Sequence, residues 1–178
     1  YLTEYQKGKE YPIHKRRKDS LENPDEILFD VNTMAEGHSY YQLGGISMAP
    51  NNQLVSFGVD NVSRRIYTIQ IKDLTTGEIL SDKIENTTGG SVWAADNQTL
   101  FYTIKDETLR AYQIWKHKLG TKQEDDVLVF EEVDDTFNAF VYKSKSRDYI
   151  IIGSSSTVSD EFRYIPSNQP DAEFKIFQ

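Results

Sequence analysis

The serines are the side chains of this sequence best suited to nucleophilic catalysis, and two stretches come near the pattern that exposes a catalytic serine. An exposed catalytic serine needs the sharp turn of a Gly-x-Ser-x-Gly pattern and a base within hydrogen-bond reach. Gly45-Ile46-Ser47-Met48-Ala49 and Gly153-Ser154-Ser155-Ser156-Thr157 both lack the final glycine. We therefore expect no catalytic residue in this sequence and no catalytic activity from the chain on its own.

The three histidines, His14, His38 and His117, are the other candidates for chemistry. None belongs to a His-Glu-x-x-His pattern or pairs with another His at helical spacing, and no calcium-loop pattern occurs. The absence of cysteine removes thiolate nucleophiles and Cys-based zinc sites. We expect neither a metal nor a cofactor. His14 and His117 are expected in strands as satisfied or surface imidazoles, and His38 as a structural or surface residue.

Arg64 and Arg65 form the pair with the clearest potential for recognition. They precede a predicted strand, at one end of a predicted blade. A guanidinium makes bidentate contacts to carboxylates and suits interfaces. Two interpretations stay open: two solvated loop cations, or a polar contact to another domain.

Charge narrows the choice of partners. The net charge is −8, and phosphate binding needs clustered positive charge, so we expect no nucleic acid partner. The basic run at 15–18 is short and is expected to be a solvated turn. Seven of the twelve residues at 124–135 are acidic. They are interpreted either as a field that attracts basic peptides or as a solvated strand edge whose charges discourage pairing.

The composition is that of a globular β protein of 178 residues, with 38% hydrophobic and 12% aromatic side chains. No apolar run approaches the roughly 18 residues of a membrane span, so no membrane partner is expected. The start, Tyr1-Leu2, has neither signal-peptide character nor an initiator Met. We interpret the chain as a piece of a longer, cytoplasmic protein, and the lack of cysteine fits a reducing compartment.

Internal repeats provide the main information about the fold. Gly44-Gly45 opens one strand-and-turn pattern, Gly89-Gly90 opens a second roughly 45 residues later, and a fainter copy starts near Asn138. Periods of this length are typical of propeller blades, in which each unit must stack on its neighbours to bury its faces. The two end blades would therefore expose apolar faces, and we expect self-association.

The strand pattern predicts an all-β fold: a partial β-propeller of about three and a half four-stranded antiparallel blades, without a helix. An antiparallel sandwich is the alternative. The predicted division is a half blade and linker at 1–37 and blades at 38–86, 87–133 and 134–178. The predicted strands are Pro12–Arg16 and Glu26–Val31; then Ile46–Met48, Leu54–Val59, Tyr67–Lys72 and Ile79–Glu85; then Ser91–Trp93, Leu100–Ile104, Tyr112–Leu119 and Val127–Glu131; and finally a strand from near Asn138, Tyr149–Gly153, Glu161–Ile165 and Glu173–Phe177.

Several stretches from Tyr11 onward resemble the N-terminal β-propeller of the prolyl oligopeptidase family, in its oligopeptidase B (protease II) branch. They are Ala35-Glu36-Gly37-His38-Ser39, Gly44-Gly45-Ile46-Ser47-Met48, Val62-Ser63-Arg64-Arg65-Ile66-Tyr67-Thr68-Ile69, Lys72-Asp73-Leu74-Thr75-Thr76-Gly77-Glu78, Val92-Trp93-Ala94, Tyr112-Gln113-Ile114-Trp115-Lys116-His117 and Phe130-Glu131-Glu132-Val133-Asp134-Asp135-Thr136-Phe137.

This resemblance implies a parent protein with a seven-bladed propeller and a C-terminal α/β-hydrolase domain carrying Ser, Asp and His. It implies cleavage of short peptides after Arg or Lys, with the propeller restricting access to the active site. The resemblance also supports Arg65 as an interdomain contact. Tyr40 stands where relatives can carry an acidic partner for it, so the contact is expected to differ or to be missing.

A second functional class is a propeller without an enzyme, acting as a protein-interaction scaffold. Such propellers often carry a Trp-Asp dipeptide in each blade. Here Ala94 follows Trp93 and Lys116 follows Trp115. The sequence therefore favours the gating domain of a serine oligopeptidase and leaves the scaffold as the alternative.

Overall fold

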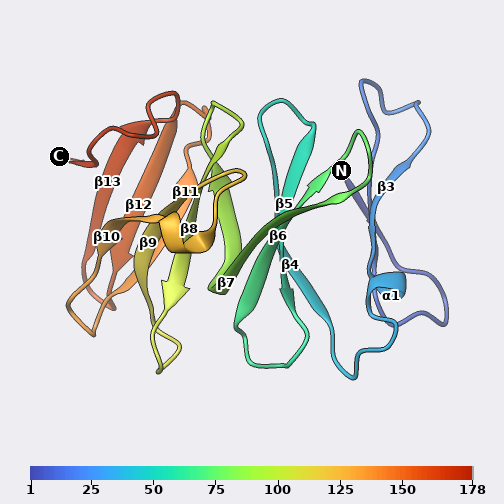
Figure 1. The fold of residues 1–178 in the computed structure, drawn as a ribbon, viewed down its shortest axis with the longest axis horizontal. Coiled ribbons are helices and arrows are strands. Elements are labelled where there is room, and N and C mark those ends of the chain that lie inside the picture. Colours follow the sequence, from blue (N-terminus) through green and yellow to red (C-terminus); the bar gives the residue numbers. More distant parts are fainter. Residues whose placement is uncertain (178) are drawn as a thin grey trace.

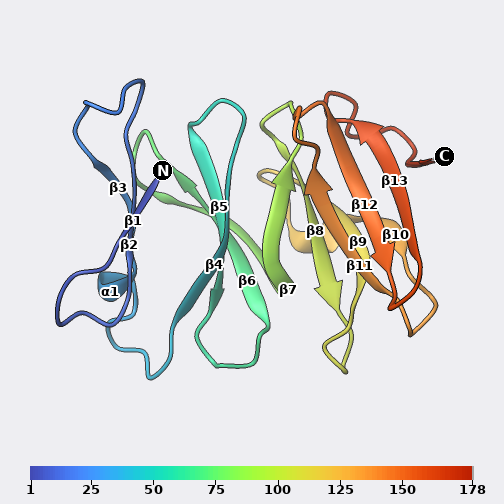
Figure 2. The ribbon, with the colours of Figure 1, turned by 180° about the vertical axis from the view of Figure 1, so that it is seen from behind.

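The computed structural model describes residues 1–177 and contains three antiparallel sheets arranged side by side (Figures 1 and 2). Within each sheet, strands that follow one another in sequence are hydrogen-bonded neighbours. The strands are β1 (Leu2–Glu4), β2 (Ile13–Arg16) and β3 (Glu26–Asp30) in the first sheet; β4 (Gln42–Met48), β5 (Leu54–Asp60), β6 (Tyr67–Asp73), β7 (Ile79–Trp93), β8 (Thr99–Lys105), β9 (Ala111–Lys118) and β10 (Val127–Glu131) in the second; and β11 (Asn138–Lys143), β12 (Tyr149–Ser155), β13 (Asp160–Pro166) and β14 (Lys175–Ile176) in the third.

The seven-stranded sheet consists of two four-stranded units that share β7. The predicted strands Ile79–Glu85 and Ser91–Trp93 are one continuous strand, and Thr87 pairs with β6 on one side and β8 on the other. We call β4 to the first half of β7 the second blade, the second half of β7 to β10 the third blade, and β11–β14 the fourth blade. The division at 86/87 falls inside β7, so the sequence-based blade boundaries stay predictions.

A tight turn between the first and second strands recurs in all three blades. Each turn has one residue with φ in the left-handed region, and a hydrogen bond of the same kind closes it. The left-handed residues are Asn52, Asn97 and Arg147, with φ of 58°, 58° and 68°. The closing bonds run from the amides of Ala49, Ala94 and Ser144 to the carbonyls of Leu54, Thr99 and Tyr149, at 2.9, 2.8 and 2.9 Å. The predicted turn chemistry is confirmed for the two asparagines.

The repeated glycine pairs allow neighbouring blades to touch backbone to backbone. A Cβ on Gly58 would lie 2.5 Å from the carbonyl oxygen of Gly89, and a Cβ on Gly45 would overlap the same peptide group. Gly89 has φ of +93° and lies over the ring of Tyr67. Only glycine meets both requirements, the close approach and the positive φ. The repeat therefore marks a packing contact rather than a catalytic turn.

The core lies between the sheets. Leu28 and Phe29 of β3 pack on Val55 and Phe57 of β5, with the Phe29 and Phe57 ring centroids 4.6 Å apart. Further apolar clusters separate the second, third and fourth blades. Blades that stack face to face in this way define the partial β-propeller, and the all-β prediction is confirmed.

Two local predictions for the start of the chain were wrong. The first sheet has three strands, because Leu2–Glu4 pairs with Ile13–Lys15 as β1. The predicted loop after Val31 begins with one helical turn, α1 (Val31–Met34), where the Asp30 side chain accepts a hydrogen bond from the Asn32 amide. A short 3₁₀ turn, η1 (Gln123–Asp125), precedes β10. None of the helices in residues 1–177 is long and apolar enough to cross a bilayer.

Candidate functional site

The loop that carries Arg64 and Arg65 is organised by one buried carboxylate. Asp60 ends β5 and is 1% exposed. Its Oδ1 accepts from the Val62 amide at 2.9 Å, and its Oδ2 accepts from the amides of Arg64 and Arg65 at 3.0 and 2.8 Å. Ser63 and Arg65 adopt positive φ angles of 59° and 57°. Three amide donors fix the backbone of this loop, so the two arginine side chains are attached to an ordered backbone.

Both arginines are exposed, and the loop between β5 and β6 that carries them lies at one end of the blades, at the lower edge of Figure 1. The neighbouring strand β8 ends at Lys105, whose Nζ donates to the Arg65 carbonyl at 2.5 Å. Burial, and then the positive charge of Arg65, lowers the pKa of Lys105. Within residues 1–177 neither guanidinium has a carboxylate partner. The loop therefore presents two unneutralised cations on a backbone held by hydrogen bonds.

The position where relatives can carry an acidic partner has a different role in this chain. The hydroxyl of Tyr40 donates to Oε1 of Gln42 at 2.6 Å. His38 is exposed, and its ring lies 5.4 Å from the ring of Tyr41. The structure does not bring Tyr40 and Arg65 into a hydrogen bond. The interdomain role of Arg64 and Arg65 remains a prediction.

The acidic segment at 124–135 has several roles. Glu124, Asp125 and Asp135 are exposed, as both interpretations require. In contrast, the Asp126 carboxylate is fully buried, and the Glu132 carboxylate accepts from the Ser154 hydroxyl of the fourth blade. The segment is therefore neither a uniform field nor a uniformly solvated edge.

The basic run at 15–18 is largely neutralised. Lys15 pairs with Glu4 at 2.5 Å, Arg16 with Glu26 at 2.8 Å, and Arg17 with Asp25 at 2.7 Å. Arg16 is also 8% exposed, because its Nη1 donates to the Asn52 carbonyl. The expected solvated turn is thus a set of ion pairs within the first sheet, and the hydrogen bond from Arg16 to Asn52 ties this sheet to the second blade.

A polar network around His117 was missed by the sequence analysis. His117 is 0% exposed; its Nδ1 lies 2.7 Å from Asp126 Oδ1 and its Nε2 lies 3.1 Å from Asp82 Oδ1. The Tyr102 hydroxyl donates to Asp126 Oδ2 at 2.8 Å. Burial raises the pKa of Tyr102 well above its ordinary value, and the hydrogen bond to Asp126 adds to this. Of the two outcomes expected for this histidine, the satisfied imidazole is the one observed.

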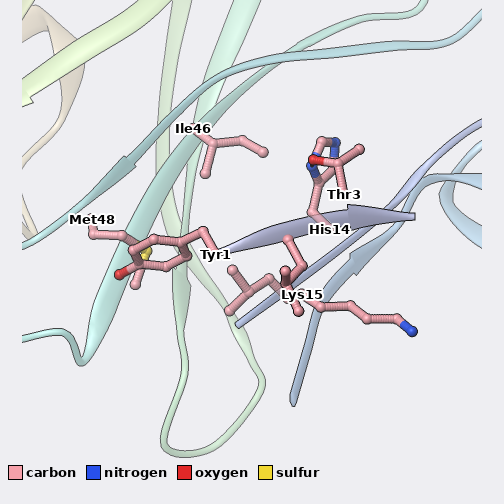
Figure 3. Close-up of a pocket in the computed structure, with 8 residues that line it drawn as sticks. Tyr1, Thr3, His14, Lys15, Ile46 and Met48 are labelled. Atoms are coloured by element: carbon pink, nitrogen blue, oxygen red, sulfur yellow. The ribbon is translucent and has the colours of Figure 1, made fainter. Parts of the chain in front are cut away.

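An apolar cavity of about 320 Å³ opens between the first sheet and β4 (Figure 3). Tyr1, Ile46 and Met48 are among its lining residues, and His14 and Thr3 provide its polar side. Thr3 Oγ1 lies 3.4 Å from His14 Nδ1, beyond the reach of a nucleophile and its base. Within residues 1–177 no carboxylate is hydrogen-bonded to His14. The cavity can accept an apolar group, but it carries no arrangement for acyl transfer.

The fold and these sites define the chain as a propeller unit that offers contact surfaces and holds no acyl-transfer site within residues 1–177. Comparison with known proteins agrees: residues 1–178 match the family model described as "Prolyl oligopeptidase, N-terminal beta-propeller domain". The chain belongs to the prolyl oligopeptidase family, and it is the propeller part of such a peptidase.

Two curated relatives show how much of such a protein is present. The chain is 38% identical over 186 residues to "Dipeptidyl aminopeptidase BI" of Pseudoxanthomonas mexicana, and 35% identical over 177 residues to "Protease 2" of Moraxella lacunata. Each match covers 96% of this chain and 26% of the relative. The chain thus spans about a quarter of their length, and the catalytic domain lies outside it.

Solved structures agree on the fold. Oligopeptidase B from Leishmania major superimposes with a TM-score of 0.92 at 34% identity, covering 99% of this chain and 26% of that protein. Oligopeptidase B from Trypanosoma brucei, in a closed form with covalently bound antipain, gives 0.85 at 26% identity, covering 99% and 25%. The predicted resemblance to the oligopeptidase B propeller is confirmed.

Proposed function

We propose that this chain is the gating part of a cytoplasmic serine oligopeptidase, in which the propeller restricts access to a Ser-Asp-His site on a separate α/β-hydrolase domain. The observation that carries the proposal is the match of the whole chain to the N-terminal propeller domain of this peptidase family. A stack of rigid blades over a cleft would admit short, unstructured peptides and exclude folded proteins. Catalysis belongs to the hydrolase domain.

Short basic peptides, cleaved after Arg or Lys, are the substrates we propose for the parent enzyme. The similarity to oligopeptidase B structures supports this choice. The test is cleavage by the parent enzyme of blocked peptides with Arg, Lys or Leu before the scissile bond. Equal kcat/KM values for the three peptides would contradict the proposal.

A second specificity is favoured by the relative at 38% identity, which is named a dipeptidyl aminopeptidase. An enzyme of that type needs a free substrate N-terminus, whereas an internal cleavage does not. The same dipeptide unit should therefore be tested with free and with blocked N-termini. A requirement for the free amine would replace the endopeptidase proposal, while the gating role of the propeller would stand.

Arg64 and Arg65 are proposed to form a polar contact to the hydrolase domain. Their exposure, their lack of carboxylate partners in residues 1–177 and the fixed Asp60 loop support this role. Arg65→Glu in the parent enzyme should raise KM for short peptides and change the salt dependence of kcat/KM, since it replaces attraction by repulsion. Lys145→Glu, at an exposed turn, is the control. Equal behaviour of the two variants would identify Arg65 as a solvated loop cation.

The scaffold alternative predicts a parent protein without a hydrolase domain. A Gly-x-Ser-x-Gly pattern encoded several hundred residues downstream of Gln178 would decide for the peptidase. Localisation of the tagged parent protein by fractionation tests the cytoplasmic assignment.

A further inference from the structure

A cationic side chain on the third strand contacts the preceding sheet or blade in the second, third and fourth blades. Lys72 and His117 hold the same repeat position, and Arg163 lies two residues before the corresponding position in the fourth blade. These residues lie on the third strand of their blades, roughly 45 residues apart. Each reaches the outermost strand of the preceding sheet or blade. The contacts are Lys72 Nζ to the Leu28 carbonyl at 2.9 Å, His117 Nε2 to Asp82 Oδ1 at 3.1 Å, and the Arg163 guanidinium over the Phe130 ring at 4.6 Å.

His117 differs from the other two in being fully buried between two carboxylates. Its Nδ1 faces Asp126 and its Nε2 faces Asp82. A carboxylate only accepts hydrogen bonds, so both ring nitrogens must donate, and an imidazole donates from both nitrogens only when it is protonated. With both carboxylates ionised, the geometry therefore requires the imidazolium form.

The surroundings of His117 support the same charge state. Asp82 faces it from β7 and Asp126 from the segment that follows η1; Tyr102 of β8 is bonded to Asp126, and the Gly120 amide donates to Asp82 at 2.5 Å. Burial opposes a charge on His117, but the hydrogen bonds to Asp126 and then Asp82 outweigh it and raise the pKa of His117. The charged groups that raise the pKa of His117 are Asp126 and Asp82.

The cluster also attaches a loop to the preceding blade. The segment at 119–126 connects β9 to β10 of the third blade, whereas Asp82 belongs to the second blade. Besides the contacts of Asp82, the loop is tied to β7 through Gln123, which accepts from the Glu85 amide at 2.8 Å and donates to its carbonyl at 3.1 Å. A cavity of about 600 Å³ on the outer side of this loop is lined by Asp82 and Gly120. Solvent that could take up the His117 proton is therefore close.

We propose that Asp82, His117 and Asp126 form a proton-dependent clasp between the second and third blades, and that loss of the His117 proton loosens the segment at 119–126. A neutral ring would turn a lone pair toward one of the two buried carboxylates, and this contact would become repulsive. The clasp is a property of the propeller itself and does not depend on the proposed function.

The direction of the pH effect follows from the raised pKa of His117. The group binds its proton more tightly in the folded chain than in the unfolded chain, where an imidazole has a pKa of about 6.5. Its contribution to stability is therefore complete below that value and is lost as the pH rises through the folded-state pKa. The clasp weakens in the alkaline direction.

The decisive measurement is an NMR titration of the imidazole rings in the whole 178-residue chain. At pH 7 both ring nitrogens of His117 should carry protons, and its pKa should lie above that of His14, which burial lowers. Protection of the Gly120 amide from hydrogen exchange should fall at least about tenfold once His117 loses its proton, while protection of the Ala94 amide stays. A neutral His117 at pH 7, or a Gly120 protection factor independent of pH, would overturn the proposal.

Two variants separate the clasp from general stability. Asp82→Asn preserves shape but removes one charge, so the pKa of His117 should fall; His117→Gln should make Gly120 protection independent of pH. Asp171→Asn is the matched control, because Asp171 pairs with Lys116 at the next joint, at 2.5 Å, and is 88% exposed. An unchanged His117 titration in Asp82→Asn would refute the clasp. If a variant fails to fold, the titration of the unaltered chain decides alone.

Discussion

The third blade packs against a neighbour on each of its two faces, and the two joints have different chemistry. On the side of the second blade, buried polar groups cross the joint: the His117 cluster, the Ser56 and Ser91 hydroxyls at 2.7 Å, and Trp93 Nε1, which donates to the Ser47 carbonyl at 3.1 Å. On the side of the fourth blade the buried centre is apolar. Its fully buried members include Phe101, Ile114, Ile150, Ile152 and Ile165.

The two joints therefore differ in how their contribution to stability depends on pH. Apolar burial contributes roughly 25 cal/mol per Å² and does not depend on pH. Buried charges are costly to desolvate and stabilise a structure only while each keeps its partner, so a joint that contains them responds to one proton. Of the two joints, the one between the second and third blades is therefore the one whose stability the pH can adjust.

Asp126→Ala should have the largest effect on this comparison. The change leaves buried His117 without one acceptor and the Tyr102 hydroxyl without its partner. Breaking such a pair costs about 3–5 kcal/mol of unfolding free energy. Urea unfolding near pH 6.5 measures the loss. Asp125→Ala, at the exposed neighbouring position, should change stability by about 0.5 kcal/mol or less. Similar losses of unfolding free energy for the two variants would show that the buried charges of this joint contribute no more to stability than an exposed carboxylate does.

Ile152→Ala tests the apolar joint in the same way. Ile152 is 1% exposed, and removing its side chain leaves a cavity between the third and fourth blades. We expect a loss of about 3 kcal/mol, equal at pH 6.5 and above the pKa of His117. Ile151→Ala, on the opposite and partly exposed face of β12, is the control and should cost less. A strongly pH-dependent loss for Ile152→Ala would mean that the two joints are not independent.

The outer face of the fourth blade has no neighbour within the described residues, and it carries an aromatic cluster. Phe140 and Tyr142 stack at 6.1 Å, Tyr149 packs on Tyr164 at 5.6 Å, and Phe177 contacts Tyr164 at 5.8 Å. A face of this kind, which other blades of this chain bury, favours association of the isolated chain.

Tyr142→Lys should therefore weaken self-association at least about tenfold, which corresponds to about 1.4 kcal/mol. The control is Val158→Lys, at a position that is 93% exposed in the β12–β13 connection and away from the sheet face. Sedimentation over a wide concentration range provides the dissociation constants. A monomer at all concentrations, or an equal effect of the two lysines, would contradict the prediction.

Much of the fold was predictable, because period, turn chemistry and strand pattern agree with one another. The predicted strand Val127–Glu131 has the observed bounds, and Ile69 and Ile71 share a buried face as expected. The strand Leu2–Glu4 was missed because its residues are exposed and show no alternation. The break predicted after Glu85 was wrong because β7 continues to Trp93, with a register shift against β8 between Thr87 and Ser91 where the glycines lie.

The polar sites were less predictable, for a physical reason. Asp82 is 35 residues from His117, and only the stacking of two blades brings it to His117 and Asp126. Asp126 also lies in an acidic run that indicates a solvated surface. The signal that could have revealed the site is the repeat itself, since Lys72 and His117 are equivalent positions. The repeat position accepts a cation, and a cation that is buried there requires a partner on the neighbouring blade.

Asp106 offers the smallest effect and the opposite pH dependence to that of the clasp. It closes the β8–β9 turn beside the Arg65 loop by accepting from the Thr108 hydroxyl at 2.6 Å and from the Arg110 amide at 3.0 Å. The hydrogen bond from Thr108, followed by those from Arg110, lowers the pKa of Asp106 to about 2.

A lowered pKa means that this turn is stabilised above the unfolded-state value of about 3.9, and that the contribution is lost as the pH falls toward 2. Protection of the Thr108 amide should therefore fall in acid, while the clasp loosens only in alkali. Asp106→Asn should abolish the acid effect and leave the His117 titration unchanged, with Glu107→Gln as the exposed control. If Asp106→Asn shifts the His117 titration, the turn and the clasp form one cooperative unit, and the two pH responses cannot be assigned to separate parts of the blade.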